Sequence, residues 1–300
     1  MKLVIDRPKN WPILKNNKKI YVISPAYSSS LEEILKINKF LENWGLEGIF
    51  YQPKERNNLE FLSNSDSDRL NELKNALYGD ESEIIFCSAG GYGSARIVKK
   101  LLKSKEAIKN KLFLGFSDIT SLHLAFNNYF KIPTLHSPML RQLAVGKIDQ
   151  QAVNFLHNIL TQKELCLSYD INPLNELAQN IKNINLPKLL GGNLSLVQTS
   201  IGTDWQINNN GDYSMLIEEF DEKFYSIDKM LNHLQNANVF NNCKAVFIGD
   251  FSKIEDKKRY LAEILKVFIS DLNIPVFKIE NIGHKKRNLA IPLGLEMILQ

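Results

Sequence analysis

Short apolar runs alternate with longer amphipathic segments along the first half of this 300-residue chain. The runs have the length of buried strands, whereas the segments between them repeat apolar residues every three or four positions, as helices do. This alternation predicts an α/β fold, a parallel sheet with helices on both faces. The predicted strands cover residues 20–23, 49–51, 83–87, 112–116 and 133–136, and the predicted helices cover residues 31–43, 66–78 and 94–103.

The pattern changes in the second half of the chain. A predicted helix around Leu156 is followed by residues 161–187, which are polar and rich in Asn. We interpret this segment as a linker between a first domain over residues 1–160 and a second domain over residues 188–300. The second domain is predicted to hold strands at residues 215–217 and 245–248 and helices at residues 225–236 and 260–268.

Ser117 lies where the predicted strand over residues 112–116 meets a helical segment that contains Leu122 and Phe126. A serine at a tight strand-to-helix junction can project its hydroxyl beyond the sheet edge, where ligands of parallel sheets bind. The first N–H groups of the helix would face any oxyanion that forms there. The alternative is that Ser117 serves only as the N-cap of the helix.

Residues 88–96 form a glycine-rich segment between a predicted strand and a predicted helix. The segment differs from a dinucleotide-binding fingerprint because Arg96 stands at the third glycine position, and it lacks the Gly-Lys-Ser/Thr of a phosphate-binding loop. Its glycines can present bare backbone N–H groups, one of which would complete an oxyanion hole at the Ser117 junction. The alternative is a glycine turn required only for helix packing.

A nucleophilic serine requires a general base and a group that orients the base. Among the five histidines, His284 follows a glycine in a polar loop, where its ring can point into a cleft. Glu218 is the first carboxylate after an apolar strand, whereas Asp221 and Glu222 are explained by the helix that begins after them. The order Ser, Glu, His matches one known arrangement of catalytic triads.

Composition limits the possible functions. The chain has 44% hydrophobic residues, 23% charged residues and a net charge of only +4, which does not favour nucleic-acid binding. Three distant cysteines and the lack of any metal-ligand spacing lead us to expect no disulfide, no metal and no cofactor. Neither a signal peptide nor a membrane-spanning segment is recognisable, so we expect a cytoplasmic protein without membrane contact.

Seven segments in a fixed order resemble the LD-carboxypeptidases, the murein tetrapeptide carboxypeptidase family of serine peptidases, whose superfamily includes the microcin C immunity proteins. One match would be weak, but seven in order are specific. The segments are Ser24-Pro25-Ala26, Gly90-Gly91-Tyr92-Gly93-Ser94-Ala95-Arg96, Gly115-Phe116-Ser117-Asp118-Ile119-Thr120, His136-Ser137-Pro138-Met139, Gly191-Gly192-Asn193-Leu194-Ser195-Leu196, Glu218-Glu219 with residues 225–231, and Gly283-His284 with Asn288 and Pro292-Leu293-Gly294.

The resemblance implies a flavodoxin-like parallel sheet in the N-terminal domain and a smaller mixed α/β C-terminal domain. It also implies roles for residues at matching positions. These are Ser117 as the nucleophile, His284 as the general base, Glu218 as the carboxylate that orients it, the backbone N–H groups of Gly91 and Asp118 as oxyanion donors, and Tyr92 and Asn193 as substrate-binding residues.

The activity that the resemblance implies is removal of the terminal D-Ala from muropeptide tetrapeptides, at the bond to meso-diaminopimelate. It implies a homodimer that works in the cytoplasm during peptidoglycan recycling, without a metal. Two alternatives share the fold: a microcin-immunity-type serine hydrolase of peptidyl or aminoacyl nucleotides, and a non-catalytic ligand-binding protein. The second alternative requires an unsuitable triad residue, and none is present.

The chain departs from the family pattern at three places. Ala89 stands where an arginine often precedes the Gly-Gly-Tyr-Gly segment, and Ser137 stands where glycine is common. Residues 285–287, directly after His284, are Lys-Lys-Arg. The departure at Ala89 concerns contacts with substrate and leaves the triad intact. The basic loop yields a hypothesis, that its cations meet carboxylates of the muropeptide; a plain solvated loop is the alternative.

Overall fold

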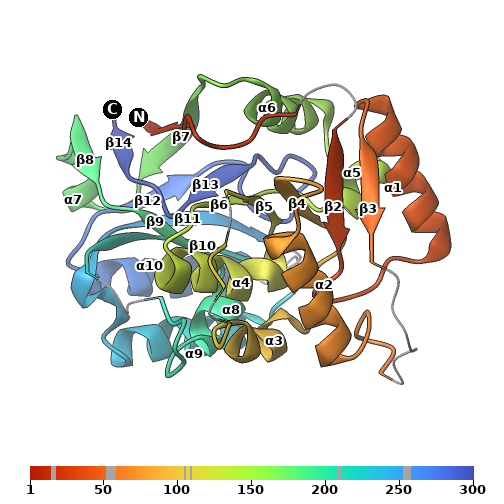
Figure 1. Ribbon diagram of the computed structural model, residues 1–300. Helices are drawn as coiled ribbons and strands as arrows, with labels where there is room; N and C mark the ends of the chain where they lie inside the picture. Colours follow the sequence, from red (N-terminus) through yellow and green to blue (C-terminus); the bar gives the residue numbers. More distant parts are fainter. Residues whose placement is uncertain (15–17, 52–58, 105, 109, 208–210, 253–257) are drawn as a thin grey trace.

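The chain folds into two β-sheets that lie side by side, with helices packed against both (Figure 1). The computed structural model describes residues 1–300 except residues 15–17, 52–58, 105, 109, 208–210 and 253–257. Both chain ends lie together, because the backbone N–H of Lys2 donates to the carbonyl of Gln300 and the Gln300 N–H donates to the carbonyl of Lys2.

The six-stranded sheet has the order β13-β6-β5-β4-β2-β3, and all of its strands except β13 run parallel. Among the parallel strands, the first in sequence lies between the second and the third, which is the flavodoxin-like order. This confirms the predicted fold class. The bounds are Lys19–Ile23 (β2), Glu47–Phe50 (β3), Ile84–Cys87 (β4), Leu112–Gly115 (β5), Thr134–His136 (β6) and Ile291–Leu293 (β13).

Both faces of this sheet are apolar because its strands are nearly continuous hydrophobic runs. In β2, Ile20 and Val22 pack toward one face with α1, α5 and α6, whereas Tyr21 and Ile23 pack toward the other with α2, α3 and α4. The helices are Leu31–Asn43 (α1), Asp66–Tyr78 (α2), Ser94–Leu101 (α3), Thr120–Leu124 (α4), Leu140–Ala144 (α5) and Gln150–Thr161 (α6), with a 3₁₀ turn at Ser117–Ile119 and a π-helical turn at Ala125–Phe130.

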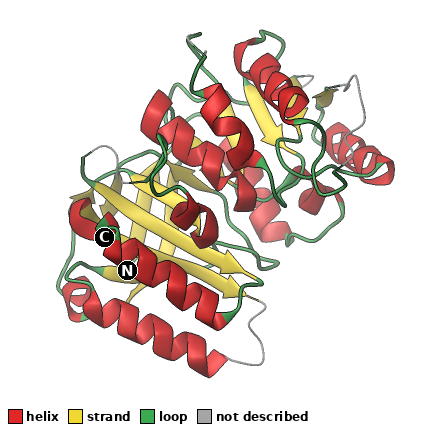
Figure 2. Ribbon diagram, turned by 90° about the horizontal axis from the view of Figure 1, so that it is seen from below, coloured by secondary structure: helices red, strands yellow, loops and turns green. Residues whose placement is uncertain are grey.

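The eight-stranded sheet lies beside both chain ends, with helices along it (Figure 2). Its order is β8-β14-β1-β7-β12-β11-β10-β9, and the strands from β9 to β12 run parallel. The strands are Lys2–Asp6 (β1), Cys166–Pro173 (β7), Ile184–Leu186 (β8), Leu189–Asn193 (β9), Tyr213–Phe220 (β10), Cys243–Ser252 (β11), Val276–Ile279 (β12) and Met297–Leu299 (β14). The helices are Glu176–Gln179 (α7), Leu194–Thr199 (α8), Phe224–Asn236 (α9) and Lys258–Asp271 (α10), with a 3₁₀ turn at Val239–Asn242.

The two sheets exchange strands across the proposed domain boundaries. The chain begins with β1, which pairs with β7 and β14 of the eight-stranded sheet, and β13 from the C-terminal region pairs with β6 of the other sheet. Residues 161–187, interpreted above as a linker, contain β7, α7 and β8. In β7, buried and exposed positions alternate, so its apolar residues are too sparse to stand out as a buried run.

The hydrophobic core runs through both halves of the molecule. One buried cluster joins Ile85 and Phe113 of the six-stranded sheet to Met215 and Val246 of the other. This continuity holds the carboxyl ends of β4 and β5 next to the carboxyl end of β10, where the predicted catalytic residues lie. Within the part of the chain that the structure describes, no helix has the length and apolar character needed to cross a bilayer.

Candidate active site

A cleft of about 710 Å³ opens where the two sheets meet. Its walls come from segments far apart in the sequence. The glycine loop at Gly90 and Gly91 and the junction at Ser117 come from the first half, whereas Asn193 and His284 come from the second. The structure therefore brings the predicted nucleophile and the predicted general base into one cavity.

Ser117 follows the last residues of β5 and begins a 3₁₀ turn. Its φ is 60°, which is uncommon for a residue other than glycine. A strained turn of this kind lifts a serine hydroxyl above the end of a sheet, as in the nucleophile elbow of other hydrolases. The side chain lines the cleft, and Ser117 is the first residue of the turn, whose N-cap is Phe116.

Asp118 ties the Ser117 junction to the glycine loop. Its buried carboxylate accepts hydrogen bonds from the backbone N–H groups of Gly93, at 3.2 Å, and Ser94, at 2.8 Å. Burial raises the pKa of Asp118, whereas these hydrogen bonds lower it. The two segments that carry the predicted oxyanion donors, Gly91 and Asp118, are thereby held together, and both residues line the cleft.

Glycine is required at position 91 for two reasons. Its φ of 103° is rarely adopted by residues with a side chain, and an added Cβ would lie 2.7 Å from Cβ of Tyr27. The N–H of Tyr27 also donates to the carbonyl of Gly90 at 3.0 Å. The glycine loop is thus a rigid backbone segment beside Ser117, which is what a preorganised oxyanion hole needs.

His284 and Glu218 form a hydrogen-bonded pair. Nδ1 of His284 lies 2.8 Å from Oε2 of Glu218, at the C-terminal part of β10. The carboxylate is fully buried, whereas 11% of the histidine side chain is exposed. An acceptor at Nδ1 fixes the tautomer in which Nε2 can take up a proton, so the ring is prepared to act as a general base.

Two phenylalanine rings hold the imidazole of His284. Phe220 stacks on it with a centroid distance of 4.6 Å and an interplanar angle of 18°, and Phe116 contacts it at 4.6 Å with an angle of 45°. Phe116 directly precedes Ser117, so the ring that fixes the histidine belongs to the same turn as the serine. Among the described residues, no hydrogen bond joins Ser117 Oγ to His284; such catalytic bonds often tighten only when substrate binds.

Glu218 stays ionised despite its burial. Burial by itself raises the pKa of a carboxylate, but the neighbouring rings of His284 and His136 outweigh this effect and lower the pKa of Glu218 to about 2. The carboxylate is therefore negative throughout the neutral range, where it can stabilise a positive charge that forms on His284.

The two predicted substrate-binding residues occupy different places. Asn193 lines the cleft, and its side chain donates to Oε1 of Glu219 at 2.8 Å. Tyr92 is half exposed, packs against Phe61 at 5.8 Å, and is absent from the described residues that line the cleft. The structure thus places Asn193 in the cleft with Ser117 and His284 and leaves Tyr92 outside the residues that line it.

The basic loop after His284 is largely tied to the protein's own carboxylates. Lys285 Nζ lies 2.6 Å from Oδ1 of Asp250, and Arg287 Nε lies 2.7 Å from Oδ2 of Asp149. Lys286 also lines the cleft, and no described carboxylate lies within ion-pair distance of it. Of the three cations, Lys286 is the one available to a substrate carboxylate.

Several polar residues of the cleft were missed from the sequence. Arg141 and Lys147 line it, and Arg141 is held over the ring of Tyr27 at 5.8 Å. Glu219 also lines it and accepts hydrogen bonds from Asn193 and Ser195. Arg141 lies two residues after the His136–Met139 segment of the family pattern. This closeness in sequence is the signal that could have identified Arg141 as a cleft residue.

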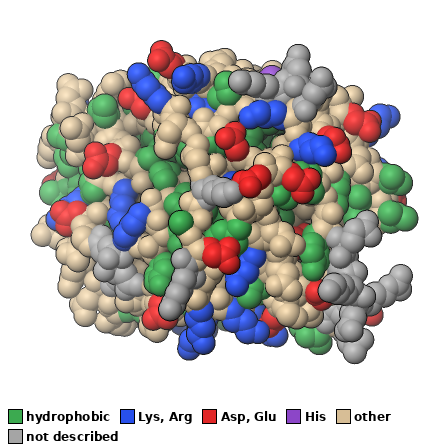
Figure 3. All heavy atoms as spheres, viewed as in Figure 1, with side chains coloured by type: hydrophobic (Ala, Val, Ile, Leu, Met, Phe, Trp, Pro, Cys, Tyr) green, Lys and Arg blue, Asp and Glu red, His purple; other side chains and the backbone are tan. Residues whose placement is uncertain are grey.

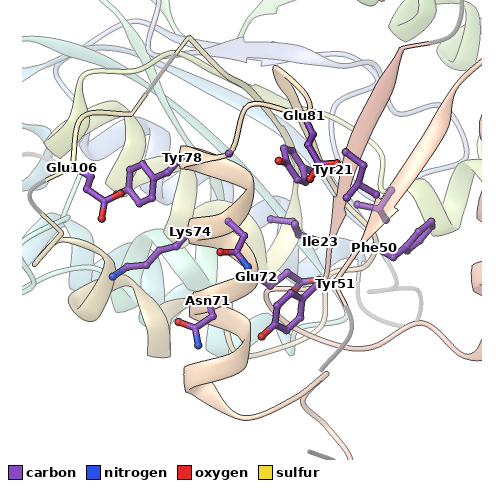
Figure 4. A pocket seen from close by; sticks show the side chains of 14 residues that line it. Tyr21, Ile23, Phe50, Tyr51, Asn71, Glu72, Lys74, Tyr78, Glu81 and Glu106 are labelled. Atoms are coloured by element: carbon purple, nitrogen blue, oxygen red, sulfur yellow. The ribbon is translucent and has the colours of Figure 1, made fainter. Parts of the chain in front are cut away.

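A second pocket, of about 760 Å³, lies between α2 and the strands β2 and β3. Figure 4 shows Glu72 of α2 in this pocket, near Ile23 and Tyr51, with the ammonium of Lys74 pointing away from it. The N–H of Ser24 donates to Glu72 at 2.9 Å, but burial dominates and raises the pKa of Glu72 to about 8. None of the predicted catalytic residues lines this pocket.

Metal-ligating groups and surface charge bear on other possible functions. In the described ranges, no group of three or more His, Cys, Asp and Glu side chains is arranged to hold a metal ion. On the face shown in Figure 3, acidic and basic side chains are intermixed. A nucleic-acid site would require a face of one sign.

Comparison with known proteins adds to this geometry. Residues 20–137 match the LD-carboxypeptidase N-terminal domain, and residues 187–299 match the LD-carboxypeptidase C-terminal domain. The chain is 38% identical over 231 residues to a putative carboxypeptidase of Rickettsia conorii, covering 77% of this chain and 72% of that protein. It is 28% identical over 286 residues to a probable murein peptide carboxypeptidase of Bacillus subtilis, covering 94% and 88% respectively.

The fold also resembles solved structures. Muramoyltetrapeptide carboxypeptidase from Oxalobacter formigenes superimposes with a TM-score of 0.74 at 22% identity, covering 94% of this chain and 95% of that chain. At this level of identity the likeness establishes the fold, and the chemistry has to be argued from the residues in the cleft.

Proposed function

The chain belongs to the LD-carboxypeptidase family, and on that premise we propose that it is a serine carboxypeptidase of murein peptides. In this proposal Ser117, His284 and Glu218 form the catalytic triad. The observation that carries it is the 2.8 Å bond between His284 and Glu218, which aligns a general base in the same cleft as a serine on a strained turn.

The reaction follows from this arrangement. His284 takes the proton of Ser117 as Oγ attacks the carbonyl before the terminal residue, and Glu218 stabilises the resulting imidazolium. The N–H groups of Gly91 and Asp118 hold the tetrahedral oxyanion; losing one such donor typically costs about 3 kcal/mol of transition-state stabilisation. His284 then returns the proton to the leaving amine, and water attacks the acyl-enzyme with the same base.

The substrate in this proposal is a tetrapeptide released from murein, cut between meso-diaminopimelate and the terminal D-Ala. Such a peptide carries several carboxylates, and the cleft presents the cations of Lys147 and Lys286, together with Arg141, whose guanidinium also lies 3.6 Å from Oε1 of Glu33. Asn193 is proposed to contact the bound peptide. We place the enzyme in the cytoplasm, in peptidoglycan recycling, as a homodimer.

A defined tetrapeptide tests the function. Purified protein incubated with L-Ala-γ-D-Glu-meso-diaminopimelate-D-Ala is expected to release D-Ala and a tripeptide, measured by mass spectrometry. Ser117→Ala should abolish release because it removes the hydroxyl that the proposal assigns as the nucleophile, whereas Ser270→Ala, on the exposed face of α10, should retain it. Release at the wild-type rate by Ser117→Ala would refute the triad. Cleavage of an aminoacyl sulfamoyl adenosine in place of the tetrapeptide would instead indicate an immunity-type hydrolase.

A further inference from the structure

Glu218 has one carboxylate oxygen that the proposed triad leaves unused. Oε2 accepts the hydrogen bond of His284, but Oε1 is buried and has no hydrogen-bond partner among the described residues. An unpaired oxygen of a buried, ionised carboxylate is costly, so native structures nearly always supply a donor.

The side chain of His136 faces this oxygen. Its Nε2 lies 3.9 Å from Oε1 of Glu218, and its side chain is fully buried. Within the described part of the chain, neither of its ring nitrogens has a hydrogen-bond partner. A buried ring nitrogen and a buried carboxylate oxygen thus face one another about 1 Å beyond hydrogen-bond distance.

The fold holds His136 rigidly in this place. It is the last residue of β6, and its backbone pairs with Gly115 of β5 and Ile291 of β13. The ring packs edge-on against Phe116 at 5.6 Å. Gly192 of β9 also lies against the ring, since a Cβ built at that glycine would be 3.5 Å from Cδ2 of His136, an ordinary contact distance.

His136 belongs to the sheet that carries Ser117, whereas Glu218 belongs to the other sheet. We propose that His136 is a positioning residue of the active site, whose Nε2–H donates to Glu218 and holds the carboxylate of one sheet in place beside the nucleophile of the other. This role rests on the proposed triad. It explains why the His136–Met139 segment is part of the family pattern although it supplies no group to the reaction.

The other groups near His136 are compatible with this role. His123 of α4 lies behind it with a centroid distance of 6.3 Å, and its ring nitrogens are engaged by Thr134 and the carbonyl of Gly115. Burial lowers the pKa of His123 to about 3, so this ring remains neutral and does not compete for Glu218. Glu219, the next carboxylate, accepts hydrogen bonds from Asn193 and Ser195.

Two measurements test the proposal. In the first, ¹⁵N-histidine NMR of the wild-type protein reads the tautomer of each ring without any substrate. We expect His136 to be protonated at Nε2. Protonation at Nδ1 alone, which leaves no donor toward Glu218, would overturn the proposal whether or not the protein is a peptidase.

In the second, kinetics on the tetrapeptide compare His136→Phe, which keeps the ring volume without a donor, with His136→Gln, which keeps a donor near the Nε2 position. We expect His136→Phe to lower kcat about 10- to 100-fold, as the loss of other orienting groups does. Its KM should stay within about twofold of the wild-type value. His136→Gln should recover much of the lost kcat. Wild-type kcat in His136→Phe would overturn the proposal. Inactivity of the wild-type protein would refute the proposed function, and the tautomer measurement would still decide the contact.

Discussion

Two buried glutamates of this protein behave in opposite ways. Glu72 lies in the pocket beside α2, where burial raises its pKa to about 8. Glu218 lies at the end of β10, where its pKa falls to about 2 although it is fully buried. Desolvation disfavours the negative charge at both sites, so the difference comes from their neighbours.

The neighbours differ in number and in closeness. Glu218 is contacted by the rings of His284 and His136, whereas Glu72 receives one backbone hydrogen bond from Ser24 and a weaker influence from Arg69. Glu218 therefore has a fixed negative charge that can serve catalysis at neutral pH, and Glu72 is mainly an uncharged acid there. Burial of a carboxylate alone does not identify an active site; its partners do.

Activity should show the largest contrast between the two sites. Glu218→Gln replaces the carboxylate that orients His284 and is expected to lower kcat about 10⁴-fold, as loss of the orienting acid does in other triads. Glu72→Gln should leave kcat/KM within about twofold, because Glu72 does not line the catalytic cleft. Kinetics of D-Ala release measure both variants. Equal losses in the two would mean that the cleft has been assigned wrongly.

The dependence of stability on pH should differ in direction as well. The pKa of Glu72 is about 8 in the folded protein and 4.5 in the unfolded chain, so the folded protein holds this proton more tightly. The free energy of unfolding should therefore fall as pH rises from 4.5 to 8. The contribution is on the order of 5 kcal/mol, and Glu72→Gln should remove it. Urea denaturation at several pH values measures this slope. An unchanged slope in Glu72→Gln would contradict the assignment.

Glu218 should contribute with the opposite sign. Its folded pKa lies below the unfolded value of 4.5, so its stabilisation is present above pH 4.5 and is lost as pH falls toward 2. Its size is on the order of 3 kcal/mol. The stability difference between the wild-type protein and Glu218→Gln should therefore shrink across this acid range in the same denaturation series. A difference that grows as the pH falls would contradict this sign.

The smallest expected effect concerns charge at the rim of the cleft. Lys286→Glu should raise KM for the tetrapeptide up to about fivefold, because an exposed charge contributes at most about 1 kcal/mol. Lys99→Glu, on α3 away from the cleft, is the matched control. An unchanged KM in Lys286→Glu would reject the hypothesis that this loop meets substrate carboxylates and would favour a plain solvated loop.

Much of the fold could be predicted from the sequence, but not all of it. The strands and helices of the six-stranded sheet are close to the predicted ranges because their apolar runs are continuous or periodic. The strand β7 was overlooked because only every second residue is buried, among them Leu167, Tyr169 and Ile171. The pairing of β1 with β14 joins residues almost 300 positions apart, which no local pattern can indicate.

For the candidate site, the sequence by itself determined the kinds of groups present: a serine at a strand-to-helix junction, a histidine in a polar loop, a carboxylate ending a strand, and glycines with exposed backbone. The tertiary structure alone decided how they meet. It placed His284 on Glu218, turned Tyr92 out of the cleft, paired Lys285 with Asp250, and brought His136 behind the carboxylate. The physical reason is that hydrogen bonding and desolvation act over a few ångströms, and only packing of the two sheets brings these distant residues that close.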